Sequence, residues 1–317
     1  MAFSDIALIV VFAALMIVII TMFICFFKTF FAFRGKKKNK NAFPVPLAKA
    51  YEPYREQMVG WIKEVGEMQR KDFSLRSEDG LLLVGHYFEY SKDAPIELMF
   101  HGYRGSSVRD LSGGVHRAFE LGHSALIVDH RASGDSEGRV ITFGIKESRD
   151  ARLWVDLIVR EIDPDAKIIL TGISMGAATV MTVASMELPP NVVGVLADCG
   201  YTSTREIIKK VIRDMKLPAD LLYPFARLSA RLFGGFDPEE SSAIESMKKC
   251  TLPVIFFHGD ADTFVPCEMS VENHAACASE KKRLVITEGA GHGLCYPKDP
   301  ELYLSEMRAF FGETIEK

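Results

Sequence analysis

The feature that most constrains this chain of 317 residues is an apolar run close to its first residue. The run extends over 22 residues, from Ile6 to Phe27, and Thr21 is its one polar side chain. A helix of that length rises ~33 Å, which matches the ~30 Å hydrocarbon core of a bilayer. A long helix buried in a soluble protein usually keeps a polar face, and a cleaved signal peptide has a basic start, a shorter apolar core and a small-residue cleavage site. Neither alternative fits, so residues 1–33 are expected to be a transmembrane anchor with its span at about 6–27.

Basic residues gather directly after this span. Six lie between residues 28 and 40, whereas Asp5 is the one acidic residue among the first forty. The positive-inside rule therefore predicts a single-pass membrane protein whose globular part lies on the cytoplasmic side. The aromatic residues that follow the span (Phe30, Phe31 and Phe33) are expected at the membrane interface. The net charge of the whole chain is −4, which gives no electrostatic reason to expect nucleic acid as a partner.

Cysteine usage agrees with a reducing compartment. Cys25 lies in the span, and the other five cysteines have no paired spacing that would indicate a disulfide framework. There is no CxxC motif or Cys/His cluster, so no metal site is predicted. No organic cofactor is implied either.

The rest of the chain divides into a connecting segment and a globular domain. Residues 34–70 are expected to form a basic tether and an amphipathic helix, and residues 71–317 an α/β domain. Within the domain, short β-rich apolar runs alternate with helical stretches, which predicts a mostly parallel central sheet with helices on both faces. The turn residues at 78–80 predict a hairpin between the first two strands.

One connection is too long for a simple crossover. Residues 201–250 separate two expected strands and contain two plausible helices, which predicts a helical cap insertion. The apolar face of the cap fits a substrate pocket, a contact with lipid or simple packing on the domain below. That face carries Leu221, Leu222, Phe225, Leu228 and Phe233.

The most specific motif is the sequence GISMG, residues 172–176, which follows the expected strand KIILT and precedes a helix of small residues. G-x-S-x-G between a strand and a helix describes a nucleophile elbow, in which a sharp turn exposes the serine at the end of the strand. The crowding of that turn requires small residues two before and two after the serine. The helix that begins at Met175 adds free N–H groups and the positive end of its dipole. Ser174 is therefore the candidate nucleophile.

A serine nucleophile needs a histidine base and an acid that orients it. His292 fits the base, because glycines surround it in a loop between the last strand and the terminal helix. Asp262, in the loop after the strand PVIFF, fits the acid best. Asp260 more simply supports that turn, and Asp198, at the end of the preceding strand, is a second rival.

An oxyanion hole needs two backbone N–H groups aimed at the developing charge. Met175, the residue after the nucleophile, is expected to supply one. Tyr103 is expected to supply the other, from the loop HGYRG that follows the strand IELMF. His101 is expected to brace this loop by hydrogen bonds.

Five motifs, in this order, resemble the α/β-hydrolase superfamily, in its serine-hydrolase branch with monoglyceride-lipase-like and prolyl-aminopeptidase-like members. They are HGYRG, DHRASGDSEG (129–138), GISMG, HGDADTFVP and GAGHG, within about residues 70–315. The order Ser174, Asp262, His292 along the chain is the one expected of that superfamily. The resemblance implies the α/β-hydrolase fold and a structural role for residues 129–138 beside the active site. The chain looks most like bacterial relatives that carry an N-terminal anchor, and residues 34–70 lie outside the shared pattern.

The residues thus predict a serine hydrolase that transfers an acyl group from a carboxylic ester to water. An anchored domain with an apolar cap favours a lipid-like or hydrophobic acyl ester as the small-molecule substrate. An aminopeptidase-like amidase and an acyl-thioesterase stay open as alternatives, as does a non-catalytic pseudo-hydrolase that binds a ligand. The cap acids Glu239, Glu240 and Glu245 fit a solvated helix face better than a site for a substrate amine. The sequence leaves the oligomeric state open.

Overall fold

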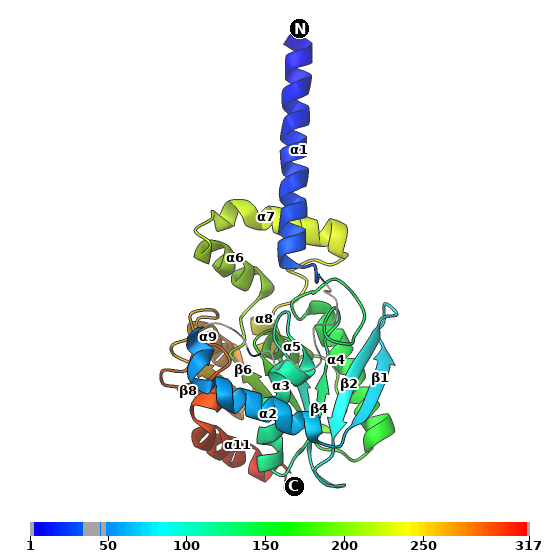
Figure 1. The fold of residues 1–317 in the computed structure, drawn as a ribbon, viewed down its shortest axis with the longest axis vertical. Coiled ribbons are helices and arrows are strands. Elements are labelled where there is room, and N and C mark those ends of the chain that lie inside the picture. Colours follow the sequence, from blue (N-terminus) through cyan, green and yellow to red (C-terminus); the bar gives the residue numbers. More distant parts are fainter. Residues whose placement is uncertain (1–2, 34–44, 46–48, 316–317) are drawn as a thin grey trace.

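An eight-stranded sheet forms the centre of the globular part (Figure 1). The computed structural model describes residues 3–33, 45 and 49–315. The strands are β1 (Lys71–Arg76), β2 (Leu82–Phe88), β3 (Ile96–Phe100), β4 (Ser124–Val128), β5 (Ile168–Ile173), β6 (Val192–Asp198), β7 (Val254–Gly259) and β8 (Lys282–Thr287), and their order in the sheet is β1-β2-β4-β3-β5-β6-β7-β8. The pairs β1–β2 and β2–β4 are antiparallel, and all other neighbours are parallel. The mostly parallel sheet that the apolar runs predicted is confirmed.

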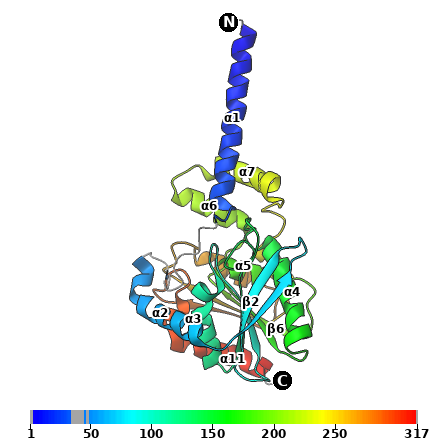
Figure 2. The same cartoon turned by 45° about the vertical axis from the view of Figure 1, so that its right-hand side comes forward.

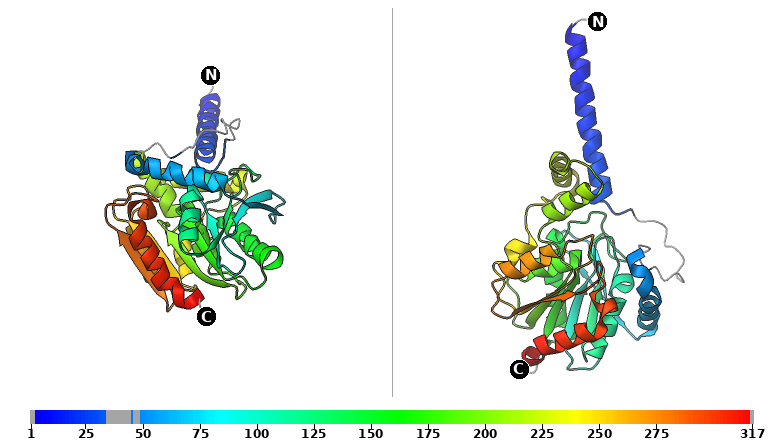
Figure 3. Two further views of the ribbon diagram at one scale, coloured as in Figure 1. Left: turned by 60° about the horizontal axis from the view of Figure 1, so that its bottom comes forward. Right: turned by 90° about the vertical axis from the view of Figure 1, so that its left-hand side faces the viewer.

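Helices cover both faces of the sheet (Figures 2 and 3). One face carries α2 (Arg55–Glu67), α3 (Ser107–Glu120) and α11 (Pro300–Ile315), and the other carries α4 (Ile145–Leu157), α5 (Met175–Val183), α8 (Ala243–Met247) and α9 (Glu268–Ala276). Short helical turns complete the domain: η1 (Lys49–Tyr54), η2 (Ile158–Ile162) and α10 (Cys295–Lys298). The central strands β3 and β4 are buried along their whole length, because both of their faces are covered.

The carboxyl ends of the parallel strands share one edge of the sheet. The loops after β3, β5, β6, β7 and β8 all leave from this edge, which faces the long N-terminal helix in Figure 1. Between β6 and β7 lie α6 (Thr204–Asp214), α7 (Ala219–Ser229), η3 (Ala230–Gly234) and α8. Both α6 and α7 lie on this side of the domain, and α7 crosses beside the lower part of the N-terminal helix (Figure 1).

The N-terminal helix, α1 (Phe3–Thr29), projects away from the domain (Figures 1 and 3). It is long and apolar enough to cross a membrane, a property that a signal sequence can share. Its first turns, up to Ile20, are exposed, and burial begins at its C-terminal end with Met22 and Phe26. The expected basic tether falls on residues 34–44 and 46–48, which lie outside the described residues.

The C-terminal end of α1 is built into the domain. The expectation that Phe30 lies at the membrane interface is wrong, because its side chain is completely buried and contacts the rings of Phe143 and Phe236. The Ile141 N–H donates to the Phe30 carbonyl at 2.8 Å, and Phe31 forms a β-bridge with Val140. Aromatic residues after a span fit a membrane interface and a protein core equally well by composition, and here the core holds Phe30.

We expect Phe30→Ala to lower the free energy of unfolding by ~3–5 kcal/mol, because the neighbouring rings cannot fill the cavity it leaves. Phe33→Ala is the matched control: its side chain is 70% exposed, so the change should be within ~0.5 kcal/mol. Denaturant unfolding of the full chain in detergent micelles measures both. Equal stability of the two variants would contradict the core role of Phe30.

Candidate active site

Ser174 stands at the turn between β5 and α5 in a strained backbone conformation, with φ 57° and ψ −114°. The turn is tight on both sides. A Cβ atom at Gly172 would lie 2.2 Å from the carbonyl carbon of Gly176, and one at Gly176 would lie 2.0 Å from the carbonyl oxygen of Phe100. Only glycine fits at either position. Such strain is typical of functional sites, and the geometry is that of a nucleophile elbow.

The structure brings His292 to Ser174 across 118 residues of chain. The two atoms that face each other, His292 Nε2 and Ser174 Oγ, are 2.9 Å apart. Tyr51 Oη–H donates to the His292 backbone carbonyl at 2.9 Å and so holds the loop in place. His292 is therefore within reach of the serine proton.

Asp262 completes the chain of contacts. Its Oδ2 lies 2.6 Å from His292 Nδ1, and its Oδ1 accepts the backbone N–H groups of Phe264 and Val265 at 2.8 and 2.9 Å. Burial by itself would raise the pKa of Asp262, but hydrogen bonds from His258 and His292 outweigh it and hold that pKa well below its usual range. The carboxylate is therefore ionised and can orient the imidazole.

The two rival acids make other contacts. Asp260 Oδ1 accepts the backbone N–H of Gly289 at 2.6 Å, which ties two loops together. Asp198 Oδ2 accepts the hydroxyl of Tyr303 at 3.0 Å, and burial raises the pKa of Asp198. Neither carboxylate has a hydrogen bond to His292 in the described part of the chain.

The loop after β3 lies beside the serine, as an oxyanion hole requires. A Cβ atom at Gly102 would lie 3.4 Å from that of Ser174, so the loop backbone approaches closely. Among the described residues, the backbone N–H groups of Tyr103 and Met175 have no protein acceptor. Both stay available to a ligand at Ser174. Their role in binding an oxyanion stays a prediction.

His101 braces this loop. Its Nε2 accepts the His130 backbone N–H at 3.1 Å, so the proton of a neutral ring lies on Nδ1, which contacts the Gly102 carbonyl at 2.7 Å. From the loop after β4, Asp129 Oδ1 accepts the backbone N–H of Ser107, the first residue of α3, at 2.7 Å. The loop over residues 129–138 therefore positions the segment that carries Tyr103.

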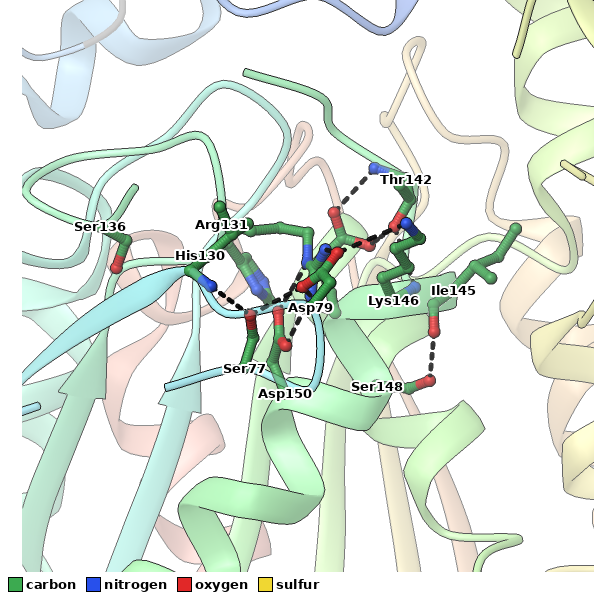
Figure 4. A network of polar contacts seen from close by, with 12 residues as sticks. Ser77, Asp79, His130, Arg131, Ser136, Thr142, Ile145, Lys146, Ser148 and Asp150 are labelled. Carbon is green, nitrogen blue, oxygen red and sulfur yellow. Dashed lines mark hydrogen bonds and ion pairs between the residues drawn. The ribbon is translucent and has the colours of Figure 1, made fainter. Parts of the chain in front are cut away.

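Arg131 anchors that loop to α4 and to the turn between β1 and β2 (Figure 4). The guanidinium contacts Asp150, from α4, at 2.7 Å through two nitrogens, and Asp79, from the hairpin turn, at 2.9 Å. Arg131 and Asp150 are both buried. Loss of one partner would leave the other charge uncompensated, so this network is structural support for the site.

The sequence patterns did not predict two residues that contact His292 and Asp262. Tyr51 belongs to a segment outside the shared motifs, and no local pattern connects it to a histidine 241 residues away. His258 lies four residues before Asp262 in the HGDADTFVP motif, and its Nε2 is 3.2 Å from Asp262 Oδ2. Its position at the end of an apolar strand was the available signal.

Two cavities meet at Ser174. The first, the Tyr51 cleft, has a volume of about 190 Å³ and is bounded by Tyr51, Arg109, Asp110 and His292. The second, the α1 pocket, has a volume of about 230 Å³ and reaches from Ser174 to the last residues of α1 and the apolar side chains of α6. The serine therefore has space on two sides, as a substrate with an acyl and a leaving group needs.

Cys199 also lies close to the contact between His292 and Asp262. Its thiol lies with Asp262 and His292 in a group whose ligand atoms are within 4.8 Å of one another. Burial raises the pKa of the Cys199 thiol, and metals bind the thiolate. The group fits a hydrogen-bonded triad better than a metal site.

Two curated proteins are distant relatives of the chain, and no family model matches it. The uncharacterized protein YqkD of Bacillus subtilis is 26% identical over 245 residues, which cover 77% of this chain and 80% of YqkD. Protein bem46 of Schizosaccharomyces pombe is 24% identical over 222 residues, 68% of each chain.

Solved structures show the fold. The esterase Pf2001 of Pyrococcus furiosus aligns with a TM-score of 0.65 and 23% identity, over 79% of this chain and 94% of the esterase. The α/β-hydrolase GrgF of a Penicillium species has a TM-score of 0.63 and 18% identity, over 79% and 100%. Est1E of Butyrivibrio proteoclasticus, solved with ferulic acid, has a TM-score of 0.59 and 22% identity, over 77% and 100%. The chain has the α/β-hydrolase fold that its motifs predicted.

The contacts predict which aspartate supports the histidine. Asp262→Asn should slow the reaction of Ser174 with a fluorophosphonate probe by ~10²–10⁴-fold, because a correctly held base contributes about that much. Asp198→Asn is the matched control. Its carboxylate accepts a hydrogen bond from Tyr303 and has none to His292 among the described residues, so the rate should change by less than about tenfold. A larger loss in Asp198→Asn than in Asp262→Asn would exchange the two assignments.

Proposed function

We propose that the chain is a membrane-anchored serine hydrolase that cleaves carboxylic esters. The observation that carries this proposal is the chain of contacts from Ser174 Oγ to His292 Nε2 at 2.9 Å and from His292 Nδ1 to Asp262 Oδ2 at 2.6 Å. Nucleophile, base and orienting acid stand at hydrogen-bonding distance, beside two unpaired backbone N–H groups. The similarity of the fold to that of an esterase also supports this reaction.

In the first half of the reaction, His292 Nε2 takes the Ser174 proton while Oγ attacks the acyl carbon. The ester carbonyl oxygen becomes an oxyanion, which the Tyr103 and Met175 N–H groups stabilise. When the tetrahedral intermediate collapses, the C–O bond to the alcohol breaks. His292 gives the proton to the leaving alcohol, and the acyl group stays on Ser174.

In the second half, water replaces the alcohol. His292 removes a proton from the water, whose oxygen attacks the acyl carbon through a second oxyanion. The bond to Ser174 Oγ then breaks, and the proton returns from His292 to the serine. The products are a carboxylic acid, the alcohol and the unchanged enzyme.

Esters are favoured over aminoacyl amides by the charges around the site. A substrate with a free amine calls for an unpaired carboxylate, and Asp110 is the acid that lines the Tyr51 cleft. Its carboxylate is paired with Arg109 at 2.6 Å. No acidic residue of the described chain lines the α1 pocket either, so neither cavity offers a free carboxylate to the amine of an aminoacyl group.

We also propose that α1 anchors the enzyme and that the hydrolase domain faces the cytoplasm. In this arrangement, residues 1–33 are the anchor, residues 34–70 connect it to the domain, and residues 71–317 carry the reaction, with the cap at about 201–250. The apolar run of 22 residues and the six basic residues after position 27 support it.

The proposed triad predicts that the losses of kcat caused by substitutions within it are not additive. Ser174→Ala should lower kcat for a short-chain ester by ~10⁶-fold, and adding His292→Ala should change it little further, because triad members act as a unit. Steady-state hydrolysis of 4-methylumbelliferyl acetate by the full chain in detergent measures this. Independent, multiplicative losses would count against the mechanism.

Sidedness has a labelling test. Ser91→Cys, in the exposed loop after β2, should react with a membrane-impermeant maleimide only after the membrane is opened. Ser4→Cys, at the exposed start of α1, is the control and should react in intact cells. The opposite pattern would put the domain outside.

A further inference from the structure

The α1 pocket links Ser174 to the helix that we assign to the membrane. Its inner end holds Ser174 and Tyr201, which are buried. At its outer end are Lys28 and Arg104, which are exposed, and Met215, which is 63% exposed. The pocket is therefore a passage from the surface to the nucleophile. Its wall along α6 is apolar and includes Ile207, Ile208, Val211 and Ile212.

The end of α1 is a fixed wall of this passage. Tyr103 Oη–H donates to the Thr29 carbonyl at 2.7 Å. Arg104 donates to the carbonyls of Lys28 and Phe31 at 2.9 and 3.1 Å. Tyr103 also supplies one expected oxyanion N–H, so the same residue joins α1 to the reaction centre.

The cap packs on α1 at a level inside the apolar run. The rings of Phe233, in η3, and Phe23 stack with centroids 4.8 Å apart. Phe23 precedes Lys28 by five residues, which is ~7.5 Å along the helix axis. If the apolar run of α1 lies in the hydrocarbon core, the cap lies at the surface of the bilayer or partly within it.

The outer side of the cap matches such a position. Leu221 and Leu232 are 62% and 64% exposed, and Leu217 and Leu228 are each 43% exposed. They lie on the elements that cross beside α1 in Figures 1 and 2 or directly before them. Exposed leucines gathered beside a spanning helix are typical of a surface that sits in the membrane interface.

We propose that the substrate is an acyl ester of the membrane itself, and that its acyl chain enters the α1 pocket sideways from the bilayer, between the end of α1 and the end of α6. This inference rests on the proposed ester hydrolysis and names its substrate class. The acyl chain lies along the α6 wall, the ester carbonyl reaches Ser174, and the leaving alcohol lies in the Tyr51 cleft. Lys28 and Arg104 stand at the opening, at the level of lipid headgroups.

The test compares a long and a short acyl ester on the full chain in phosphatidylcholine vesicles. Val211→Trp fills the pocket. It should lower kcat/KM for vesicle-borne 4-methylumbelliferyl palmitate at least about tenfold, because excluded methylenes lose their burial. Hydrolysis of the acetate ester should stay within about threefold, since a two-carbon acyl group does not need the pocket. Arg213→Trp, exposed on the same helix, is the control and should leave both rates unchanged.

A second pair of variants changes exposed residues, so it does not disturb the interior of the α1 pocket. Met215→Asp, at the exposed opening, should also lower palmitate hydrolysis selectively. The fluorescence of Leu228→Trp should be quenched by lipids brominated on their acyl chains more strongly than that of the native protein, whose two tryptophans, Trp61 and Trp154, are buried. Failure of this quenching would overturn access from the bilayer.

The outcomes separate the two proposals. If the native chain reacts with a fluorophosphonate and hydrolyses both esters, but Val211→Trp and Met215→Asp leave palmitate hydrolysis unchanged, the pocket does not take the acyl chain and ester hydrolysis stands. An equal loss for both esters would likewise overturn the pocket's role. If the native chain neither reacts with the probe nor cleaves either ester, the proposed function itself fails.

Discussion

A Cβ atom at Gly176 would lie 2.0 Å from the carbonyl oxygen of Phe100, so the end of β3 and the first turn of α5 meet as bare backbone. This contact brings the loop after β3 onto the N-terminal end of α5. The backbone of Gly102 consequently lies close to Ser174, since a Cβ atom at Gly102 would be 3.4 Å from that of Ser174. The arrangement depends on two glycines and a strained serine, and it would be lost with any larger residue at those two positions. The same loop carries the side chains that bind α1, so the geometry of the elbow extends to the rim of the domain.

The contacts between α1 and the domain indicate that the N-terminal segment does more than tether the domain. A helix that only tethers an enzyme needs no fixed orientation relative to the reaction centre. Here Phe30 is buried among the rings of Phe143 and Phe236, and the carbonyls at the end of the helix accept hydrogen bonds from Tyr103 and Arg104. These contacts give α1 a defined place beside the pocket that reaches Ser174. A chain that began after residue 33 would lack a core side chain and one wall of the α1 pocket.

The sheet, the elbow and the meeting of Ser174, Asp262 and His292 could be predicted from the sequence, because each depends on a short local pattern. Buried parallel strands are continuous apolar runs, and the elbow needs its two glycines within five residues. Burial of Phe30 and the contact from Tyr51 to the His292 carbonyl could not be predicted. Both join segments far apart in the chain, and an aromatic residue after an apolar span is equally compatible with a membrane interface. Their catalytic meaning, like the domain boundaries, stays a prediction.

Two carboxyl groups at the ends of neighbouring strands illustrate how surroundings assign roles. Asp198 is the last residue of β6, Asp262 lies in the loop after β7, and both side chains are buried. Burial raises the pKa of Asp198, whose neutral partner Tyr303 compensates only in part. Asp262 is subject to the same burial, yet two imidazoles and two backbone N–H groups hold its pKa well below the usual range. Only Asp262 therefore stays ionised at low cost while in contact with His292. Different surroundings can thus drive the pKa values of two buried carboxyl groups apart, and here the lowered pKa belongs to Asp262, the carboxyl that contacts His292.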